Sequence, residues 1–165
     1  MNPLTHCTIP VGLAVLLLVV SQGLASAADE PRAALSLPPG AGNPRNSEGD
    51  FIRLKDERVM FVYTHFTGGA GNHSKAHLAA RYSSDAGKTW TTSDKVALRN
   101  EGDWNIMSVS LLRLDDGSIA LFYMRKNSLQ DCRPLLRRSI DEGKTWSKPT
   151  EIIKAPVGYY VMNND

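Results

Sequence analysis

Two octets decide the fold, Ser83-Ser-Asp-Ala-Gly-Lys-Thr-Trp90 and Ser139-Ile-Asp-Glu-Gly-Lys-Thr-Trp146. Both follow the pattern S-x-D-x-G-x-T-W, which suits a tight turn. The Asp carboxylate can accept backbone N–H groups inside the turn, and Gly can adopt the positive φ that the turn requires. Ser and Thr hydroxyls can fasten the turn, and Trp can bury a large apolar area. We therefore expect the pattern residues to serve structure rather than chemistry, namely Ser83, Asp85, Gly87, Trp90, Ser139, Asp141, Gly143 and Trp146.

The sequence before each octet repeats as well. Residues 54–63 (LKDERVMFVY) match residues 114–123 (LDDGSIALFY), so that Tyr63 and Tyr123 lie 60 positions apart. The Asp-Gly pair inside the second segment is a strong hairpin signal. Nearly continuous apolar runs at 59–63 and 119–123 are typical of strands covered on both faces. A fourth strand is expected after each tryptophan, following predicted strands at 51–54, 58–64, 77–83, 109–114, 118–124 and 135–139.

A four-stranded antiparallel unit that repeats every 50–60 residues indicates a blade of a β-propeller. The predicted fold is therefore all-β, with blades at about 45–100 and 101–157 and a third that begins at about 158. One blade cannot bury both of its faces, and closed propellers have about four to eight blades. We therefore expect residues 45–165 to be the N-terminal part of a larger propeller, and this chain to be inactive by itself.

The first 28 residues differ in composition from the rest. Residues 9–20 are almost unbroken apolar sequence, which is too short for a membrane-spanning helix of about 20 residues. The small residues at 25–28 offer an A-x-A cleavage site, so residues 1–27 are predicted to be a secretory signal peptide. An uncleaved anchor is the alternative, because residues 1–7 contain no Lys or Arg. The prediction is a secreted or periplasmic protein, free of the membrane after cleavage, with an irregular lead-in at 28–44.

Charge and cysteine content exclude some classes of function. The net charge is +2, from 19 basic and 17 acidic residues, and no basic block stands out. The sequence therefore does not favour a nucleic-acid partner. Cys132 is the only cysteine after the predicted signal, and we expect a structural thiol there. No metal or other cofactor is expected.

The octets match the Asp-box motif of sialidases and related propellers, and residues 43–52 resemble the first-strand entry of bacterial sialidase-like proteins. The chain is therefore similar to the sialidase (neuraminidase) family. This resemblance implies a six-bladed propeller with exo-α-sialidase activity, which removes terminal sialic acid or a related acidic sugar from a glycan. In that family three arginines hold the substrate carboxylate, a Tyr assisted by a Glu is the nucleophile, and an Asp protonates the leaving oxygen.

The resemblance assigns roles to residues of the first unit. Arg45 matches the first arginine of the family, and a guanidinium suits a carboxylate because it can donate two parallel hydrogen bonds. In the family the general-acid Asp lies in the loop equivalent to residues 67–77, where this chain has Asn72. Because Asn cannot act as a general acid, His73 and Glu48 are the candidate catalytic acids, with Asp50 as another local carboxylate. Asn72 remains a candidate substrate contact.

The second unit offers possible sugar contacts. Residues 104–108 resemble the entry to the second blade, where sialidases place polar groups against the N-acyl pocket. Asn105, Ser108 and Asp131 are the candidates, and an ordinary solvated role is open for each. The alternative to a glycosidase is a non-catalytic carbohydrate-binding or receptor-like propeller, which Asn72 would suit. A Tyr/Glu pair and two more arginines beyond Asp165 would favour the enzyme.

Overall fold

The computed structural model describes residues 33–154 and 156–162. The predicted signal peptide, at 1–27, lies outside the described residues. The first sheet contains β1 (Arg45–Arg53), β2 (Val59–Phe66), β3 (Ala76–Ser83) and β4 (Lys95–Leu98). The second contains β5 (Asn105–Arg113), β6 (Ile119–Lys126), β7 (Cys132–Ser139) and β8 (Thr150–Glu151). None of the described residues forms a helix long and apolar enough to cross a membrane.

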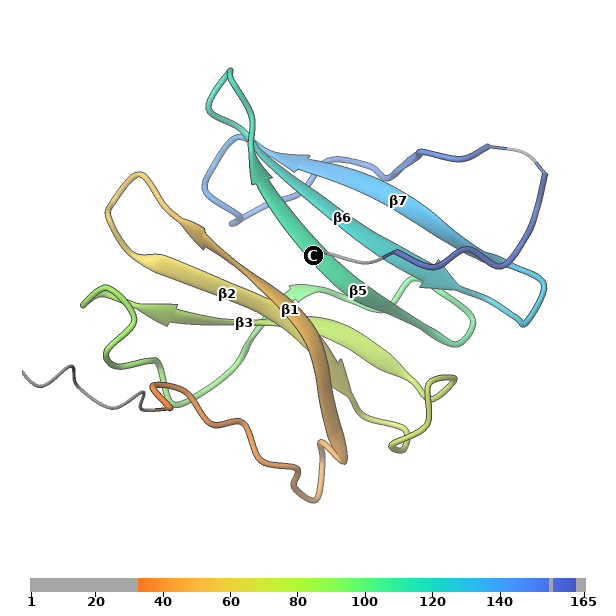
Figure 1. Ribbon diagram of the computed structural model, residues 1–165, viewed down its shortest axis with the longest axis horizontal. Coiled ribbons are helices and arrows are strands. Elements are labelled where there is room, and N and C mark those ends of the chain that lie inside the picture. Colours follow the sequence, from red (N-terminus) through yellow and green to blue (C-terminus); the bar gives the residue numbers. More distant parts are fainter. Residues whose placement is uncertain (1–32, 155, 163–165) are drawn as a thin grey trace, which may run out of the picture. The chain divides into compact units, whose positions relative to one another are not determined.

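Each sheet is a four-stranded antiparallel meander, in the orders β1-β2-β3-β4 and β5-β6-β7-β8 (Figure 1). The all-β class and the two repeated blades predicted from the sequence are confirmed, and the described chain has the architecture of part of a propeller. β1 begins at Arg45, six positions before the predicted strand. The residues at the start of β1 are polar, so the apolar pattern did not predict a strand there, although these residues pair with the end of β2.

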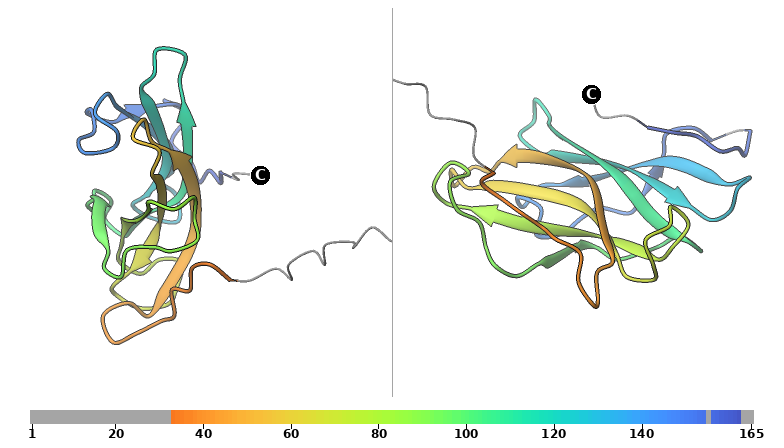
Figure 2. Two further views of the ribbon diagram at one scale, coloured as in Figure 1. Left: turned by 90° about the vertical axis from the view of Figure 1, so that its left-hand side faces the viewer. Right: turned by 60° about the horizontal axis from the view of Figure 1, so that its bottom comes forward.

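The two sheets pack against each other with β1 and β5 as neighbouring strands, and the views of Figure 2 agree with this arrangement. Apolar side chains of both sheets meet in one core, which buries Met60, Val62, Leu78, Val109, Leu121 and Leu135 almost completely. Burying a side chain of this size contributes about 1.5–3 kcal/mol relative to leaving it in water. This shared core fixes the ends of β1 and β5 relative to each other.

Both octets fold into the same hydrogen-bonded turn. One carboxylate oxygen of Asp85 accepts the backbone N–H of Thr89 at 2.8 Å, and the other accepts its hydroxyl at 2.6 Å. Asp141 and Thr145 repeat the two bonds at 2.9 and 2.6 Å. These bonds favour the charged carboxylate and lower the pKa of both aspartates to about 2.

The glycines of the octets adopt the left-handed conformation, with φ of 89° at Gly87 and 77° at Gly143. The two tryptophans differ in their surroundings. The indole N–H of Trp90 donates to the carbonyl of Gly87 at 3.0 Å, whereas Trp146 packs against the core shared by the sheets. The second octet therefore lies closer to the contact between the sheets than the first does.

These two aspartates should make the protein sensitive to acid. Their pKa falls from 3.8 to about 2 on folding, so their contribution is present above about pH 4 and is lost as the pH falls towards 2. We expect the double variant Asp85→Asn, Asp141→Asn to lose less melting temperature than the wild type between about pH 5 and pH 2.5. Asp115→Asn is the control, because this exposed carboxylate makes no hydrogen bond among the described residues. If the melting temperatures of all three proteins fall equally with pH, the acid sensitivity does not come from Asp85 and Asp141.

An ion pair connects the second octet to the first sheet. Arg113 of β5 donates from Nη1 and Nη2 to the two carboxylate oxygens of Glu142, at 2.7 and 2.8 Å. The same carboxylate accepts the backbone N–H of Lys55 at 2.9 Å, and Arg113 also donates to the carbonyl of Arg53 at 2.7 Å. The hydrogen bonds from Arg113 lower the pKa of Glu142. We call Arg113, Glu142 and the turn at 53–55 the inter-sheet clamp.

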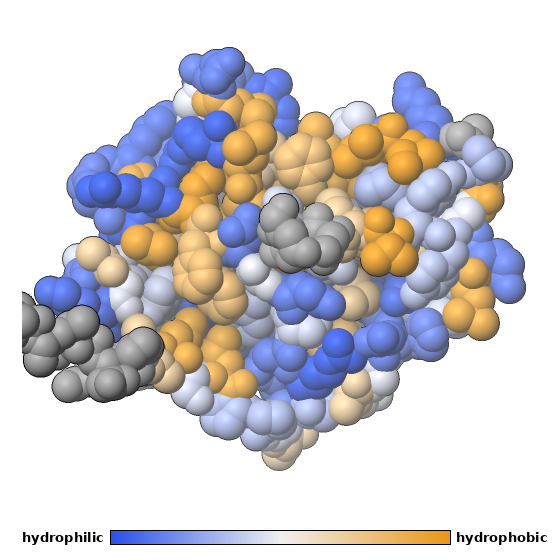
Figure 3. All heavy atoms as spheres, viewed as in Figure 1, coloured by the Kyte–Doolittle hydropathy of each residue, from blue (hydrophilic) through white to orange (hydrophobic). Residues whose placement is uncertain are grey.

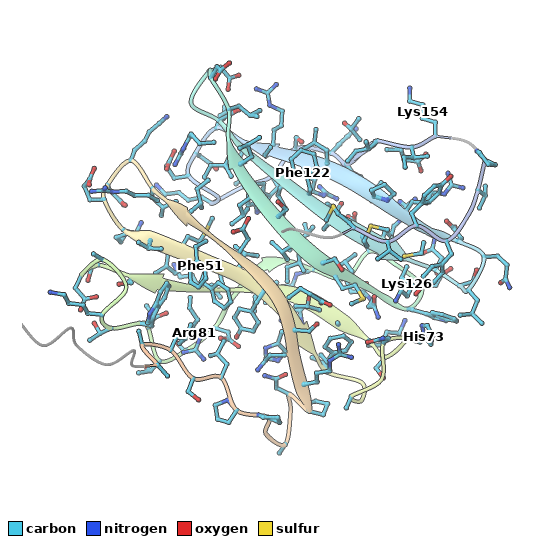
Figure 4. All side chains as sticks on the ribbon, viewed as in Figure 1. Phe51, His73, Arg81, Phe122, Lys126 and Lys154 are labelled. Atoms are coloured by element: carbon cyan, nitrogen blue, oxygen red, sulfur yellow. The ribbon has the colours of Figure 1, made fainter. Side chains whose placement is uncertain are left out.

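Each sheet also presents apolar side chains that the described residues leave exposed. Phe51 is 54% exposed and stacks on Phe61 with ring centroids 4.3 Å apart. Leu112 of the second sheet is 52% exposed. Hydrophobic residues gather in Figure 3 around the positions at which Figure 4 labels Phe51 and Phe122. Exposed apolar patches of this kind are typical of surfaces that bind another protein, a membrane or a ligand.

Candidate functional site

A β-bulge interrupts each of the two neighbouring strands. In β1 the register passes from Ser47 opposite Thr64 to Gly49 opposite Tyr63, which leaves Glu48 as the extra residue. In β5 the irregularity falls between Met107 and Ser110, and Ser108 has a positive φ of 59°. Bulges re-aim side chains, and a positive φ at a residue other than glycine is uncommon away from functional sites and tight turns. The two bulges lie 60 positions apart in the repeat.

The bulges open onto one pocket of about 280 Å³. The pocket brings together four residues singled out in the sequence, Arg45, Glu48, Asn72 and Ser108, and adds Lys126. Its walls are partly apolar and include Met107, Met124 and Tyr159. A few convergent polar groups on an apolar wall are typical of small-molecule sites. We take this pocket as the candidate site.

Arg45 is engaged by the loop between β2 and β3. Its Nη1 donates to the carbonyl of Ala70 at 3.2 Å and to the side-chain oxygen of Asn72 at 2.5 Å. The guanidinium also lies over the ring of Phe66, 4.7 Å from its centroid. Asn72, which occupies the position expected for an acid, therefore acts as a hydrogen-bond acceptor for Arg45.

Lys126, at the end of β6, is the functional residue that sequence reasoning missed. It is only 4% exposed, and its Nζ lies 3.2 Å from the carbonyl oxygen of Asn72 and 5.3 Å from the ring centroid of Tyr159. The repeat contained a usable signal. Phe66 and Lys126 occupy equivalent positions, 60 apart, so a cation replaces a buried aromatic residue in the second unit.

Asn105 lies beneath the loop rather than open to the pocket. It is completely buried, and its Nδ2 donates to the carbonyls of Asn72 at 3.0 Å and Ser74 at 2.8 Å. Its Oδ1 is buried without a hydrogen-bond partner among the residues that the structure describes. Asn105 therefore holds the first sheet's loop against the second sheet, and its donor is already used.

Three other candidates do not line the pocket. His73 is exposed, with its ring centroid 4.5 Å from that of Trp104, at the same end of the sheets as Lys126 (Figure 4). Asp131 accepts bonds from Asn127 at 2.8 Å and Arg133 at 2.9 Å, and these bonds lower its pKa. Asp50 accepts the backbone N–H of Leu111 at 2.7 Å and so joins the two sheets.

Glu48 is the one carboxylate that lines the pocket among the described residues. Its side chain is exposed and accepts the hydroxyl of Ser47 at 2.7 Å. The pocket thus combines two basic side chains, Arg45 and Lys126, with a single carboxyl group. No cluster of three or more His, Cys, Asp or Glu suited to a metal occurs in the described part of the chain.

Two buried tyrosines form a second set of polar contacts outside the pocket. Tyr63 donates its hydroxyl to Asp94 at 2.7 Å, and Tyr123 donates to Glu101. Burial, and then the neighbouring carboxylate, raise the pKa of both tyrosines. They remain protonated at neutral pH, so we interpret them as ties between each sheet and its neighbouring connections.

Comparisons with known proteins locate the fold. No protein-family model and no curated protein matches the chain. A protein of unknown function from Dyadobacter fermentans matches 69% of this chain and 38% of its own, at 19% identity and a TM-score of 0.58. A Hadza microbial sialidase matches 67% of this chain and 26% of its own, at 17% identity and a TM-score of 0.52.

A polysaccharide lyase, an ulvan lyase, matches 68% of this chain and 25% of its own, at 15% identity and a TM-score of 0.47. The chain therefore spans well under half the length of each of these solved structures. At such low identities the likeness to the first two structures shows a shared fold and nothing finer. This chain is built as part of a β-propeller-like fold that also occurs in a sialidase.

Proposed function

We propose that the protein is a glycosidase of the exo-α-sialidase type, which cleaves a terminal acidic sugar from a glycan. The observation that carries the proposal is the pocket at the two bulges, where Arg45 and Lys126 accompany a single carboxylate, Glu48. Cations suit the acidic group of the sugar, and a carboxylic acid suits the glycosidic oxygen. The fold shared with a microbial sialidase supports the same reading.

In this proposal Glu48 gives its proton to the leaving oxygen as the glycosidic bond breaks. The bulge at Glu48 aims its side chain into the pocket, and no other carboxylate among the described residues lines it. Asn72 cannot take this role because a neutral amide has no acidic proton at working pH. It instead positions the guanidinium of Arg45 through the bond at 2.5 Å.

We further propose that other blades complete the site and supply the nucleophile. Phe51 and Leu112 leave apolar surface exposed on the two sheets, and the chain spans 38% or less of the solved structures with which it was compared. Closed propellers place their central site among several blades. A pocket that is open towards further blades agrees with this arrangement.

The test is an assay with 4-methylumbelliferyl N-acetylneuraminate, using the protein expressed with whatever coding sequence flanks residues 1–165 in its gene. We expect hydrolysis by that form and none by the 165-residue chain alone. The matched substrates are the neutral β-N-acetylglucosaminide and the acidic β-glucuronide of the same fluorophore. Absence of hydrolysis of both acidic substrates by the longer form would overturn the proposal.

One observation favours a second candidate, a carbohydrate-binding propeller without catalysis. Asn72 stands where the related enzymes carry an acid, and its side chain is committed to Arg45. Under this alternative the longer form binds sialylated glycans on an array but leaves them intact. Binding without turnover would thus separate the two candidates.

A further inference from the structure

We propose that Lys126, rather than Arg45, is the cation that selects an acidic ligand in the pocket. The ligand class is a sugar that carries a carboxylate. This inference rests on the proposed function, because it assumes that the pocket is a sugar site. The resemblance seen in the sequence instead predicted that Arg45 binds the carboxylate of the ligand.

Lys126 is a buried charge without a counter-ion among the described residues. Its side chain is 4% exposed, and no carboxylate lies within ion-pair distance of Nζ among residues 33–154 and 156–162. Its contacts are the carbonyl of Asn72 at 3.2 Å, the sulfur of Met107 at 3.5 Å and the ring of Tyr159 at 5.3 Å, all of them neutral. Neutral partners of this kind do not compensate a buried ammonium, because burial of an isolated charge is strongly unfavourable.

The protein already occupies one nitrogen of the Arg45 guanidinium. Asn72 and the carbonyl of Ala70 accept from its Nη1, and the ring of Phe66 covers one face of the guanidinium at 4.7 Å. A ligand carboxylate would have to displace Asn72 to use that nitrogen. Lys126 needs no such displacement, because its ammonium has three donors and lines the pocket.

Neighbouring residues shape the site around Lys126. The strained residue Ser108, with a φ of 59°, lines the same pocket, and Asn105 holds the adjacent loop from below. Met107 and Met124 also line the pocket, and the sulfur of Met107 lies 3.5 Å from Nζ of Lys126. Apolar groups beside an ammonium strengthen its attraction to an anion. The pocket therefore has the preorganised character expected of an anion site.

The test compares acidic and neutral monosaccharides as ligands of the protein expressed with the coding sequence that flanks residues 1–165 in its gene. The probes are N-acetylneuraminic acid and glucuronic acid, with N-acetylglucosamine and glucose as neutral partners, titrated by NMR at constant ionic strength. We expect the wild type to prefer an acidic sugar about tenfold or more, since bonds to a charged group are about twice as strong as neutral ones. The two acidic sugars distinguish a sialic acid from a uronic acid.

Lys126→Met should abolish this preference, because methionine matches the apolar surroundings but carries no charge. Lys75→Met is the matched control. The ammonium of Lys75 also donates to a backbone carbonyl, that of Asp103, but Lys75 does not line the pocket, so the preference should persist. If Lys126→Met fails to fold, Lys126→Gln serves instead, because glutamine can still donate to the carbonyl of Asn72. Arg45→Met should reduce the preference less than the lysine variants do.

The inference is overturned if the wild type binds acidic and neutral sugars equally or binds neither, or if Lys126→Met keeps the preference. Loss of the preference in Lys75→Met would also overturn it, because the effect would then come from the overall charge of the protein. The binding titration does not measure hydrolysis. A chain that selects acidic sugars through Lys126 but belongs to a protein without turnover would refute the proposed activity and leave this inference intact.

Discussion

Glu48→Gln should lower the rate of hydrolysis of a natural sialoside by about 10²- to 10⁴-fold, the usual contribution of a general acid. Glutamine keeps the size of the side chain and its bond from Ser47, but it has no proton to give. Binding of the acidic sugar should change little, because the two cations of the pocket remain. The measurement is kcat and KM for the catalytically active form with a sialylated oligosaccharide.

The loss should depend on the leaving group. An aryl leaving group such as 4-methylumbelliferone departs with little help from an acid, so its hydrolysis should fall much less than that of the oligosaccharide. The control is His73→Gln, because the ring of His73 lies tilted against that of Trp104 and does not line the pocket. Equal losses on both substrates in Glu48→Gln, or a large loss in His73→Gln, would reject Glu48 as the proton donor.

Glu142→Gln should lower the free energy of unfolding by about 1–2 kcal/mol, because it leaves Arg113 without its charged partner between the sheets. The side chain of Glu142 is 17% exposed and that of Arg113 is 29% exposed. Water therefore screens this pair less than a surface pair. Chemical denaturation near neutral pH measures the change.

Glu57→Gln is the matched control for this prediction. Glu57 also has a positive φ, 68° against 62° at Glu142, and also pairs with an arginine, Arg53. Both side chains of this pair are exposed, at 72% for Arg53 and 70% for Glu57, so the change should stay within about 0.5 kcal/mol. Equal effects of the two substitutions would show that the inter-sheet clamp is no stronger than a surface pair.

The pH dependence provides an independent check. The pKa of Glu142 is lowered in the folded state from 4.5, so its contribution is present above that value and is lost as the pH falls below it. The difference in stability between the wild type and Glu142→Gln should therefore shrink below about pH 4.5. A difference that stays constant down to about pH 3 would mean that the carboxylate charge is not responsible.

The fold could be predicted from the sequence because its signals are local. Each octet sets its own turn through Asp85 or Asp141, and the Asp-Gly pair at 116–117 sets a hairpin without help from distant residues. The repetition of these signals then indicated the blades. Polar residues at the start of β1 carried no such signal, so the true start of that strand was missed.

The site could be predicted only in part because its contacts are distant in sequence. The resemblance selected Arg45 and Asn72, which lie 27 positions apart and form a hydrogen bond. It could not show that Asn105 is buried beneath the loop, or that Lys126 faces the carbonyl of Asn72 across 54 positions. The bulges that aim Glu48 and Ser108 depend on strand register, which no single segment specifies.

The inter-sheet clamp has a consequence for how repeated sheets find their proper neighbours. Ala86 occupies in the first octet the position that Glu142 occupies in the second. Asp115 occupies in the second sheet's hairpin turn the position that Lys55 occupies in the first sheet's turn. If the first octet packed against the hairpin turn of the second sheet instead, the methyl group of Ala86 would lie beside the carboxylate of Asp115. That contact would have neither the ion pair nor the hydrogen bond to the turn. Chains of similar units are prone to misassembly during folding. The differences between Glu142 and Ala86 and between Lys55 and Asp115 thus favour the correct order of the two sheets over the interchanged one.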